Sequence, residues 1–333
     1  MAYQTGIAQN EYDLLDKLNR FLTTDSTLVG NGQAWTVLFD RTLPATPTQK
    51  DIRQIVWKST GTGTEQTLYL GCESINSIAD DTYNLQFFGG VFFVEEKISN
   101  SSIQPGMINC SPEVVLFADN RPIVYHFVAD GRSCKVITRI ANVCSTVYAG
   151  FILPTVPPTE YPYPFCVAGS SSRKKGLTYS SSALFPRYSY TNQYHSSIVD
   201  PRAGNCWLFT PDQTWRDFYG GQCETYSTDS NYQYLYPTCV ERILGSRRAY
   251  IFQAMAASPG EHYPLLPVEF FSEGRSSQGE NRWGCYDGVY WIPGVQRAVG
   301  DEVILPNGHK GLVCNAGFRT TTMDYFVIDL GEV

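Results

Sequence analysis

A succession of short β-rich segments, each closed by turn residues, constrains the fold of this chain more than any other feature. Apolar and β-branched runs recur from residue 34 to 141, and Gly, Pro, Asn or Asp residues separate them. Such a pattern indicates an antiparallel sandwich or barrel. Asp130-Gly131 predicts a hairpin between strands at 123–128 and 133–141, and Gly89-Gly90 predicts another turn. The other strands expected in this half cover residues 34–39, 54–58, 66–72, 83–88, 91–94 and 114–117.

Five prolines between residues 154 and 164 interrupt this pattern. Proline fixes φ and lacks a backbone donor, so this segment should be an extended connector. It divides a β-sandwich domain at 33–153 from a second β-rich, Tyr/Gly-rich domain at 165–333. The turn at 306–310 predicts a hairpin in the second domain. Strand signals in that domain lie at 248–253, 288–292, 302–305, 311–314 and 325–330.

Residues 1–32 form an N-terminal arm with one short amphipathic helix. Leu14, Leu18 and Phe21 recur at the spacing of one helical face, and Asn10 offers the side-chain oxygen of an N-cap. Most such faces pack on the protein's own core. The alternative is that Leu14, Leu18 and Phe21 contact a neighbouring subunit, which makes them candidate interface residues. The expected fold class is mainly β, with antiparallel β-sandwich-like domains and this one helix.

Composition argues against several classes of protein. Charged residues make up 17% of the 333 residues and the net charge is −7, whereas a nucleic-acid binder needs a basic surface. The N-terminus has neither the basic start nor the apolar run of a signal peptide, and no apolar stretch approaches the ~20 residues of a membrane span. The ten cysteines include no C-x-x-C pair. We therefore expect no zinc site, and mostly free, buried thiols.

No motif predicts catalysis. The chain lacks the Gly-x-Ser-x-Gly elbow and glycine-rich phosphate loops, and its four histidines lack metal-ligand spacing. We predict no catalytic residue, no metal and no cofactor. Aromatic clusters are the best candidates for binding, because tyrosine joins an apolar ring to a polar edge and suits glycans or protein interfaces. They are Tyr161-Pro-Tyr163, Tyr188 with Tyr190, and Tyr232 with Tyr234 and Tyr236.

Short phrases across the chain resemble a family of tailed-bacteriophage virion structural proteins. They follow one another in matching order from about residue 8 to 330. They are AQNEYDLLDKL at 8–18, GQAWTV at 32–37, TLYLG at 67–71, TVYAGFILP at 146–154 running into PYP at 162–164, HYPLLP at 262–267, YDGV at 286–289, FRT at 318–320 and DY at 324–325.

The resemblance implies a non-enzymatic tail or baseplate protein that links tail parts or holds fibres. Its expected location is the virion, after assembly in the host bacterial cytoplasm. Its expected partners are other tail or baseplate proteins and further copies of itself, in a three-fold or six-fold ring. One alternative is a receptor-binding module of the tail, in which Tyr-rich loops between 179 and 236 bind host-surface glycans. A less favoured alternative is a polysaccharide depolymerase that uses paired carboxylates.

Overall fold

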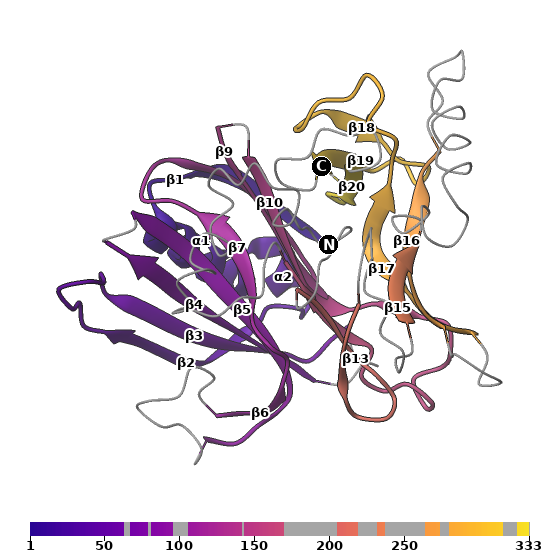
Figure 1. The fold of residues 1–333 in the computed structure, drawn as a ribbon, viewed down its shortest axis with the longest axis horizontal. Coiled ribbons are helices and arrows are strands. Elements are labelled where there is room, and N and C mark those ends of the chain that lie inside the picture. Colours follow the sequence, from indigo (N-terminus) through magenta and orange to yellow (C-terminus); the bar gives the residue numbers. More distant parts are fainter. Residues whose placement is uncertain are drawn as a thin grey trace.

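The computed structural model in Figure 1 shows three antiparallel sheets and an N-terminal pair of helices, which confirms the mainly β prediction. The N-terminal and central sheets meet on one side, and the C-terminal sheet covers the other side of the central sheet. The structure describes residues 1–62, 67–78, 81–95, 106–141, 143–169, 205–218, 232–236, 264–273, 280–315 and 325–332.

The N-terminal sheet has the order β2-β3-β4-β5-β6, and β7 also pairs with β5. Gly89 and Gly90 lie inside β5 and pair with β4, so the predicted turn there is wrong. A Cβ atom on Gly89 would lie 2.6 Å from Val167 Cγ2, which shows why the position needs glycine. The strands are β2 (Thr36–Leu43), β3 (Ile52–Ser59), β4 (Leu68–Ser77), β5 (Thr82–Phe93), β6 (Met107–Cys110) and β7 (Val114–Ala118).

The central sheet has the order β1-β8-β9-β10-β12-β13-β14. Its strands are β1 (Ala2–Ala8), β8 (Ile123–Ala129), β9 (Ser133–Ile140), β10 (Val143–Phe151), β12 (Phe165–Ala168), β13 (Cys206–Phe209) and β14 (Trp215–Asp217). The β8–β9 hairpin confirms the prediction at Asp130-Gly131. Asp130 Oδ1 closes the turn by accepting from the backbone amides of Arg132 and Ser133, at 2.7 and 2.8 Å.

Strand pairing does not follow the predicted domain division. β10 and β12 pair from Tyr148↔Ala168 to Phe151↔Phe165, so one sheet continues across the predicted connector at 154–164. The predicted N-terminal arm also contributes β1 to this sheet, along β8. The proline-rich segment therefore connects two neighbouring strands of one sheet, and the sequence signal for a boundary marks a loop.

The C-terminal sheet has the order β15-β16-β17-β20-β19-β18, and β11 (Leu153–Pro154) also pairs with β17. Pairing of β18 with β19 confirms the hairpin predicted at 306–310. The strand predicted at 248–253 lies outside the described residues. The strands are β15 (Tyr232–Tyr236), β16 (Leu266–Glu273), β17 (Glu280–Trp291), β18 (Glu302–Ile304), β19 (Lys310–Asn315) and β20 (Tyr325–Asp329).

The two faces of the central sheet belong to two different hydrophobic cores. In β12, Phe165 and Val167 pack into the core shared with the N-terminal sheet, whereas Cys166 and Ala168 pack into the core shared with the C-terminal sheet. Neighbouring residues of a strand point to opposite faces, so a sheet covered on both sides needs apolar residues at consecutive positions. This requirement explains the continuous apolar run in β12.

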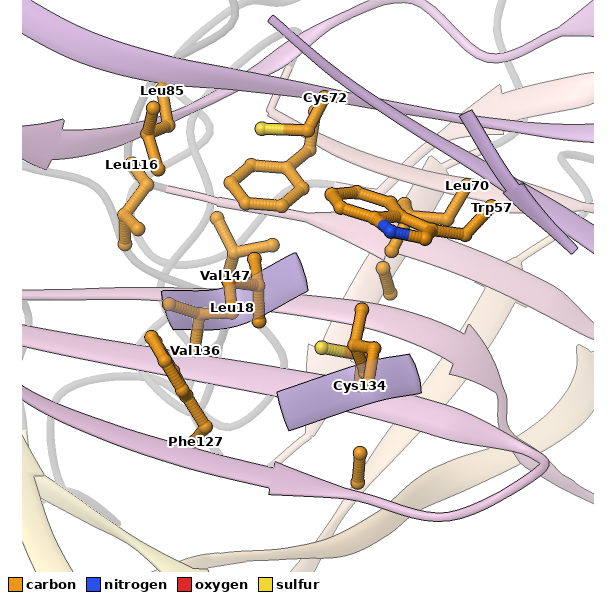
Figure 2. Packing of buried hydrophobic residues seen from close by; sticks show 14 of the residues in the cluster. Leu18, Trp57, Leu70, Cys72, Leu85, Leu116, Phe127, Cys134, Val136 and Val147 are labelled. Atoms are coloured by element: carbon orange, nitrogen blue, oxygen red, sulfur yellow. The ribbon is translucent and has the colours of Figure 1, made fainter. Parts of the chain in front are cut away.

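The helix predicted near the N-terminus is α1 (Glu11–Thr24), followed by α2 (Ser26–Gly30). Asn10 caps α1, because its Oδ1 accepts from the Asp13 amide at 2.9 Å. Leu14, Leu18 and Phe21 are buried in the core between the N-terminal and central sheets. Figure 2 shows Leu18 near Val136 and Val147 of the central sheet. The interpretation of these three residues as a partner interface is therefore corrected: they pack on the chain's own sheets and are not open to a neighbour.

Candidate binding pocket

A pocket opens where the end of β5, the proline-rich segment and the β13–β14 hairpin meet. Its cavity volume is about 110 Å³. None of the eight described lining residues carries a charge, and four of them carry an aromatic ring. The lining residues are Phe92, Tyr161, Pro162, Tyr163, Phe209, Thr210, Pro211 and Gln213. We call this the aromatic pocket.

Aromatic rings form a continuous framework along the pocket. The ring centroid of Tyr163 lies 6.2 Å from that of Phe92 and 6.4 Å from that of Phe209, and Phe209 lies 5.3 Å from Trp215. Phe209 is buried, whereas Phe92 is 49% exposed. At one end of the framework, Phe209 lies in the core between the N-terminal and central sheets; at the other end, the ring of Phe92 is exposed.

Tyr161 fixes the proline-rich segment in place. Its side chain is buried, and its hydroxyl donates a hydrogen bond to the Phe209 carbonyl of β13. Burial raises the pKa of Tyr161 well above its usual value, so the hydroxyl stays protonated and remains a donor. The Ile152 amide also donates to the Pro164 carbonyl, at 2.8 Å. These contacts hold Pro162 and Tyr163 at the pocket wall.

The β13–β14 turn supplies the polar side of the pocket. Arg216, Thr210 and Thr214 all donate to the Asp212 carboxylate. Partial burial alone would raise the pKa of Asp212, but these donors outweigh it and lower the pKa to about 2. Because Asp212 and Arg216 neutralise each other, the charges of this turn do not act as a free anion or cation beside the pocket.

Two residues with left-handed backbone meet at the rim. Gln213 has φ +60° and Asn109, in β6, has φ +52°. Asn109 Nδ2 donates to the Gln213 carbonyl at 3.4 Å, and Trp215 Nε1 donates to the Asn109 carbonyl at 2.9 Å. A non-glycine residue in this conformation is strained and persists where surrounding contacts hold it, often at a functional site. Here those contacts link the N-terminal sheet to the central sheet.

Only some of the tyrosines that the sequence marks as candidate binding residues lie at the pocket. Tyr163 lines the pocket, and Tyr161 positions it. Tyr188 and Tyr190 lie outside the described residues, while Tyr232, Tyr234 and Tyr236 lie in β15, which pairs with β16 and contributes no described lining residue. Sequence reasoning missed Phe92, Phe209 and Gln213. They come from segments far apart in the chain, and no local signal marks them as neighbours.

A second cluster of polar side chains, outside the aromatic pocket, lies around Asp329. His309 Nδ1 lies 3.1 Å from the buried Asp329 carboxylate, which also accepts from Asn307 Nδ2 at 3.2 Å and from the Gly331 amide at 2.7 Å. These contacts join the β18–β19 turn to β20. Within the described ranges, no group of three or more His, Cys, Asp or Glu residues is arranged to hold a metal ion.

The eight described cysteines are free thiols, and most of them are buried. Burial raises the pKa of Cys110 and of Cys134 to about 12. Because the thiolate is the reactive form, these two side chains are poor nucleophiles near neutral pH. Cys223 and Cys239 lie outside the described residues. None of the described helices is long and apolar enough to cross a membrane.

Comparison with protein-family models found no match, and comparison with curated proteins found none either. The pocket and the sheet edges are therefore the features of the structure that bear on function.

Proposed function

We propose that this protein is a non-enzymatic structural component of a tailed-phage virion, a tail or baseplate protein that links tail parts or holds fibres. The resembling phrases at 8–18 and 146–154 support the proposal, because they lie in elements that determine the fold. The first spans the end of β1 and the buried part of α1, and the second spans β10 and β11. A likeness that includes such elements favours a shared architecture over a shared surface motif.

The edge strand β1 is the observation that carries an assembly role. β1 is the last strand of the central sheet as the described residues define it, and it pairs with β8 over seven residue pairs. It contains neither a charged residue nor a proline, and Ile7 is 56% exposed. Proteins usually protect such an edge with charges, prolines or a covering segment, because its free backbone groups can pair with another chain.

The other described sheet edges are less suited to pairing. β14 and β18 have three residues each, β6 has four, and β7 and β15 have five each, so all are shorter than β1. Lys310 and Glu302 also form an ion pair at 3.0 Å beside β18. β2 is longer but carries Asp40, which pairs with Arg53 at 2.8 Å. Among the described edge strands, β1 is therefore the longest one without a charged residue or a proline, which favours it for adding a strand from another copy.

The mode of pairing sets the symmetry of the assembly. Pairing of β1 with β1 of a second copy would give a two-fold dimer. A three-fold or six-fold ring around a tail axis requires β1 to pair head-to-tail with a different, shorter edge of the next copy, at a rotation that closes the ring. Assembly in the host bacterial cytoplasm, followed by incorporation into the virion beside other tail proteins, is consistent with a chain whose described cysteines are free thiols.

Light scattering on the purified chain tests this proposal. We expect the native protein to have the mass of a closed ring, and we expect Ile7→Lys to be a folded monomer, because a charge on an edge strand opposes pairing. Val29→Lys is the matched control: Val29 is 55% exposed but lies on the helix α2 and belongs to no strand, so the ring should persist.

Two results would count against the proposal. A native chain that stays monomeric at every concentration, and with extracts of candidate tail proteins, would contradict the assembly role itself. A ring that survives Ile7→Lys would reject β1 as its contact. Circular dichroism of each variant must show the native spectrum, so that loss of assembly is not confused with loss of fold.

A further inference from the structure

We propose that the aromatic pocket binds one neutral hexopyranose ring of a larger glycan, stacked on Phe92 and Tyr163. This role is independent of assembly through β1. The pocket lies at the junction of β5 with the β13–β14 hairpin, whereas β1 lies at the opposite edge of the central sheet from β14.

The aromatic side of the pocket matches the apolar face of a sugar. A pyranose ring presents axial C–H groups on its faces, and those hydrogens carry partial positive charge. The face of an aromatic ring is negative, so the two surfaces attract each other. A half-exposed phenylalanine is ordinary by itself, but Phe92 lies at the wall of a concave site whose second ring, Tyr163, is held from behind by Phe209.

The polar side of the pocket matches sugar hydroxyls. Ligand sites commonly combine apolar walls with a few polar groups that fix orientation. Here the carboxamide of Gln213 is that group, because the Thr210 hydroxyl already donates to Asp212 and accepts from Arg216. A carboxamide both donates and accepts, as a sugar hydroxyl does. A proline-rich peptide docks along an extended aromatic-lined groove, so the compact pocket with an amide at its rim favours the sugar.

The charge of the pocket selects a neutral sugar. None of the described lining residues is acidic or basic, and the neighbouring Arg216 is already paired with Asp212. A uronic acid or a sialic acid would bring a carboxylate to a site whose described residues offer it no free cation. Desolvating an unpaired carboxylate is costly, and we expect these acidic sugars to be excluded.

The rim is preorganised for this contact. Gln213 keeps its left-handed backbone because its amide donates to the Thr210 carbonyl at 2.9 Å and its carbonyl accepts from Asn109. Glycine adopts the same backbone without strain. Gln213→Gly should therefore preserve the turn, and removes only the carboxamide that we assign to the sugar.

Saturation-transfer difference NMR on the full chain tests the proposal, with methyl glucoside, methyl galactoside and methyl mannoside as probes. A single ring should bind weakly, with Kd of about 1 mM. We expect at least one probe to bind, with transfer strongest at its ring protons.

Phe92→Ala should weaken that binding at least tenfold, and Gln213→Gly should weaken it severalfold without lowering thermal stability. Ile78→Ala, which changes a 46% exposed side chain beyond the far end of β5, should bind as the native chain does.

Each other outcome would overturn the proposal. No saturation transfer from any neutral hexoside at about 20 mM, twentyfold above the expected Kd, would show that the pocket is not a sugar site. Binding that survives Phe92→Ala would place the sugar elsewhere on the chain. Equal binding of methyl glucuronide would contradict the selection against acidic sugars, and preferential binding of acetyl-tetraproline amide would identify a peptide site.

Discussion

At the scale of single residues, Glu11 is the side chain least suited to its surroundings. It is 1% exposed, and neither carboxylate oxygen has a hydrogen-bond partner among the described residues. A carboxylate in the first turn of a helix is normally favourable, because the exposed amides there carry partial positive charge. Burial nevertheless raises the pKa of Glu11, and the negative charge of Asp119 adds to the rise. Desolvation therefore outweighs the helix dipole at this position.

Replacing this carboxyl with an amide should stabilise the protein. A carboxyl whose pKa is raised by folding favours the native state while it is protonated, and this stability is lost as the pH rises through the folded pKa. Glu11→Gln imitates the protonated form. We expect it to raise the free energy of unfolding by about 1 kcal/mol at pH 7, and by much less at pH 4. Urea denaturation at both pH values measures the difference.

Asp16 provides a control of opposite sign for this measurement. Hydrogen bonding to Arg53 lowers the pKa of Asp16, so its carboxylate stabilises the native state above the unfolded pKa, and that contribution is lost as the pH falls. Asp16→Asn should therefore destabilise the protein at pH 7. A stabilising Asp16→Asn, or a destabilising Glu11→Gln, would show that the balance of burial and pairing has been misjudged.

At the scale of elements, predictability depends on whether the cause of a structure is local. The hairpin at Asp130-Gly131 was predictable, because the aspartate side chain closes the turn within three residues. Asn10 likewise identified the start of α1. Gly89-Gly90 gave a wrong turn, because turns and close packing both select glycine. The aromatic pocket was only half predictable: Tyr161 and Tyr163 stand together in the sequence, but their partners come from other segments.

A single methyl group at Gly89 should disturb the contact between two sheets. The added Cβ would lie 2.6 Å from Val167 Cγ2 and 2.7 Å from the Phe165 ring, both in the central sheet. Forcing extra volume into a packed core costs about 1–3 kcal/mol. We expect Gly89→Ala to lower the free energy of unfolding by that amount in urea denaturation. Gly30→Ala is the control, because no described atom beyond its chain neighbours and its own helix backbone lies within 4 Å of the added methyl. Its stability should be unchanged or slightly higher. Equal stability of both variants would contradict the packing explanation.

At the scale of the whole molecule, the central sheet contains strands from both of the domains that the sequence predicts. Its strands come from β1 at the N-terminus, from the middle of the chain, and from β12 to β14 beyond the proline-rich segment. Each face of the sheet serves a different core. The prolines alone indicate a boundary, because the pairing of β10 with β12 depends on packing over the whole chain and has no local signal in the sequence.

Removing residues 1–30 should therefore unfold the protein. The deletion takes away β1, which is one edge of the central sheet, and the buried side chains of α1. Truncating one of these side chains alone, as in Leu18→Ala, should cost about 2–5 kcal/mol, which is a large part of the stability of an ordinary domain.

We expect the shortened chain to lack near-ultraviolet circular dichroism and a cooperative urea transition. Leu18→Ala should keep both, with a lower urea midpoint, and Val29→Ala, which changes an exposed side chain of α2, should match the native chain. A shortened chain that still unfolds cooperatively would show that this segment is dispensable for the core and would restore the idea that it docks on a neighbouring subunit.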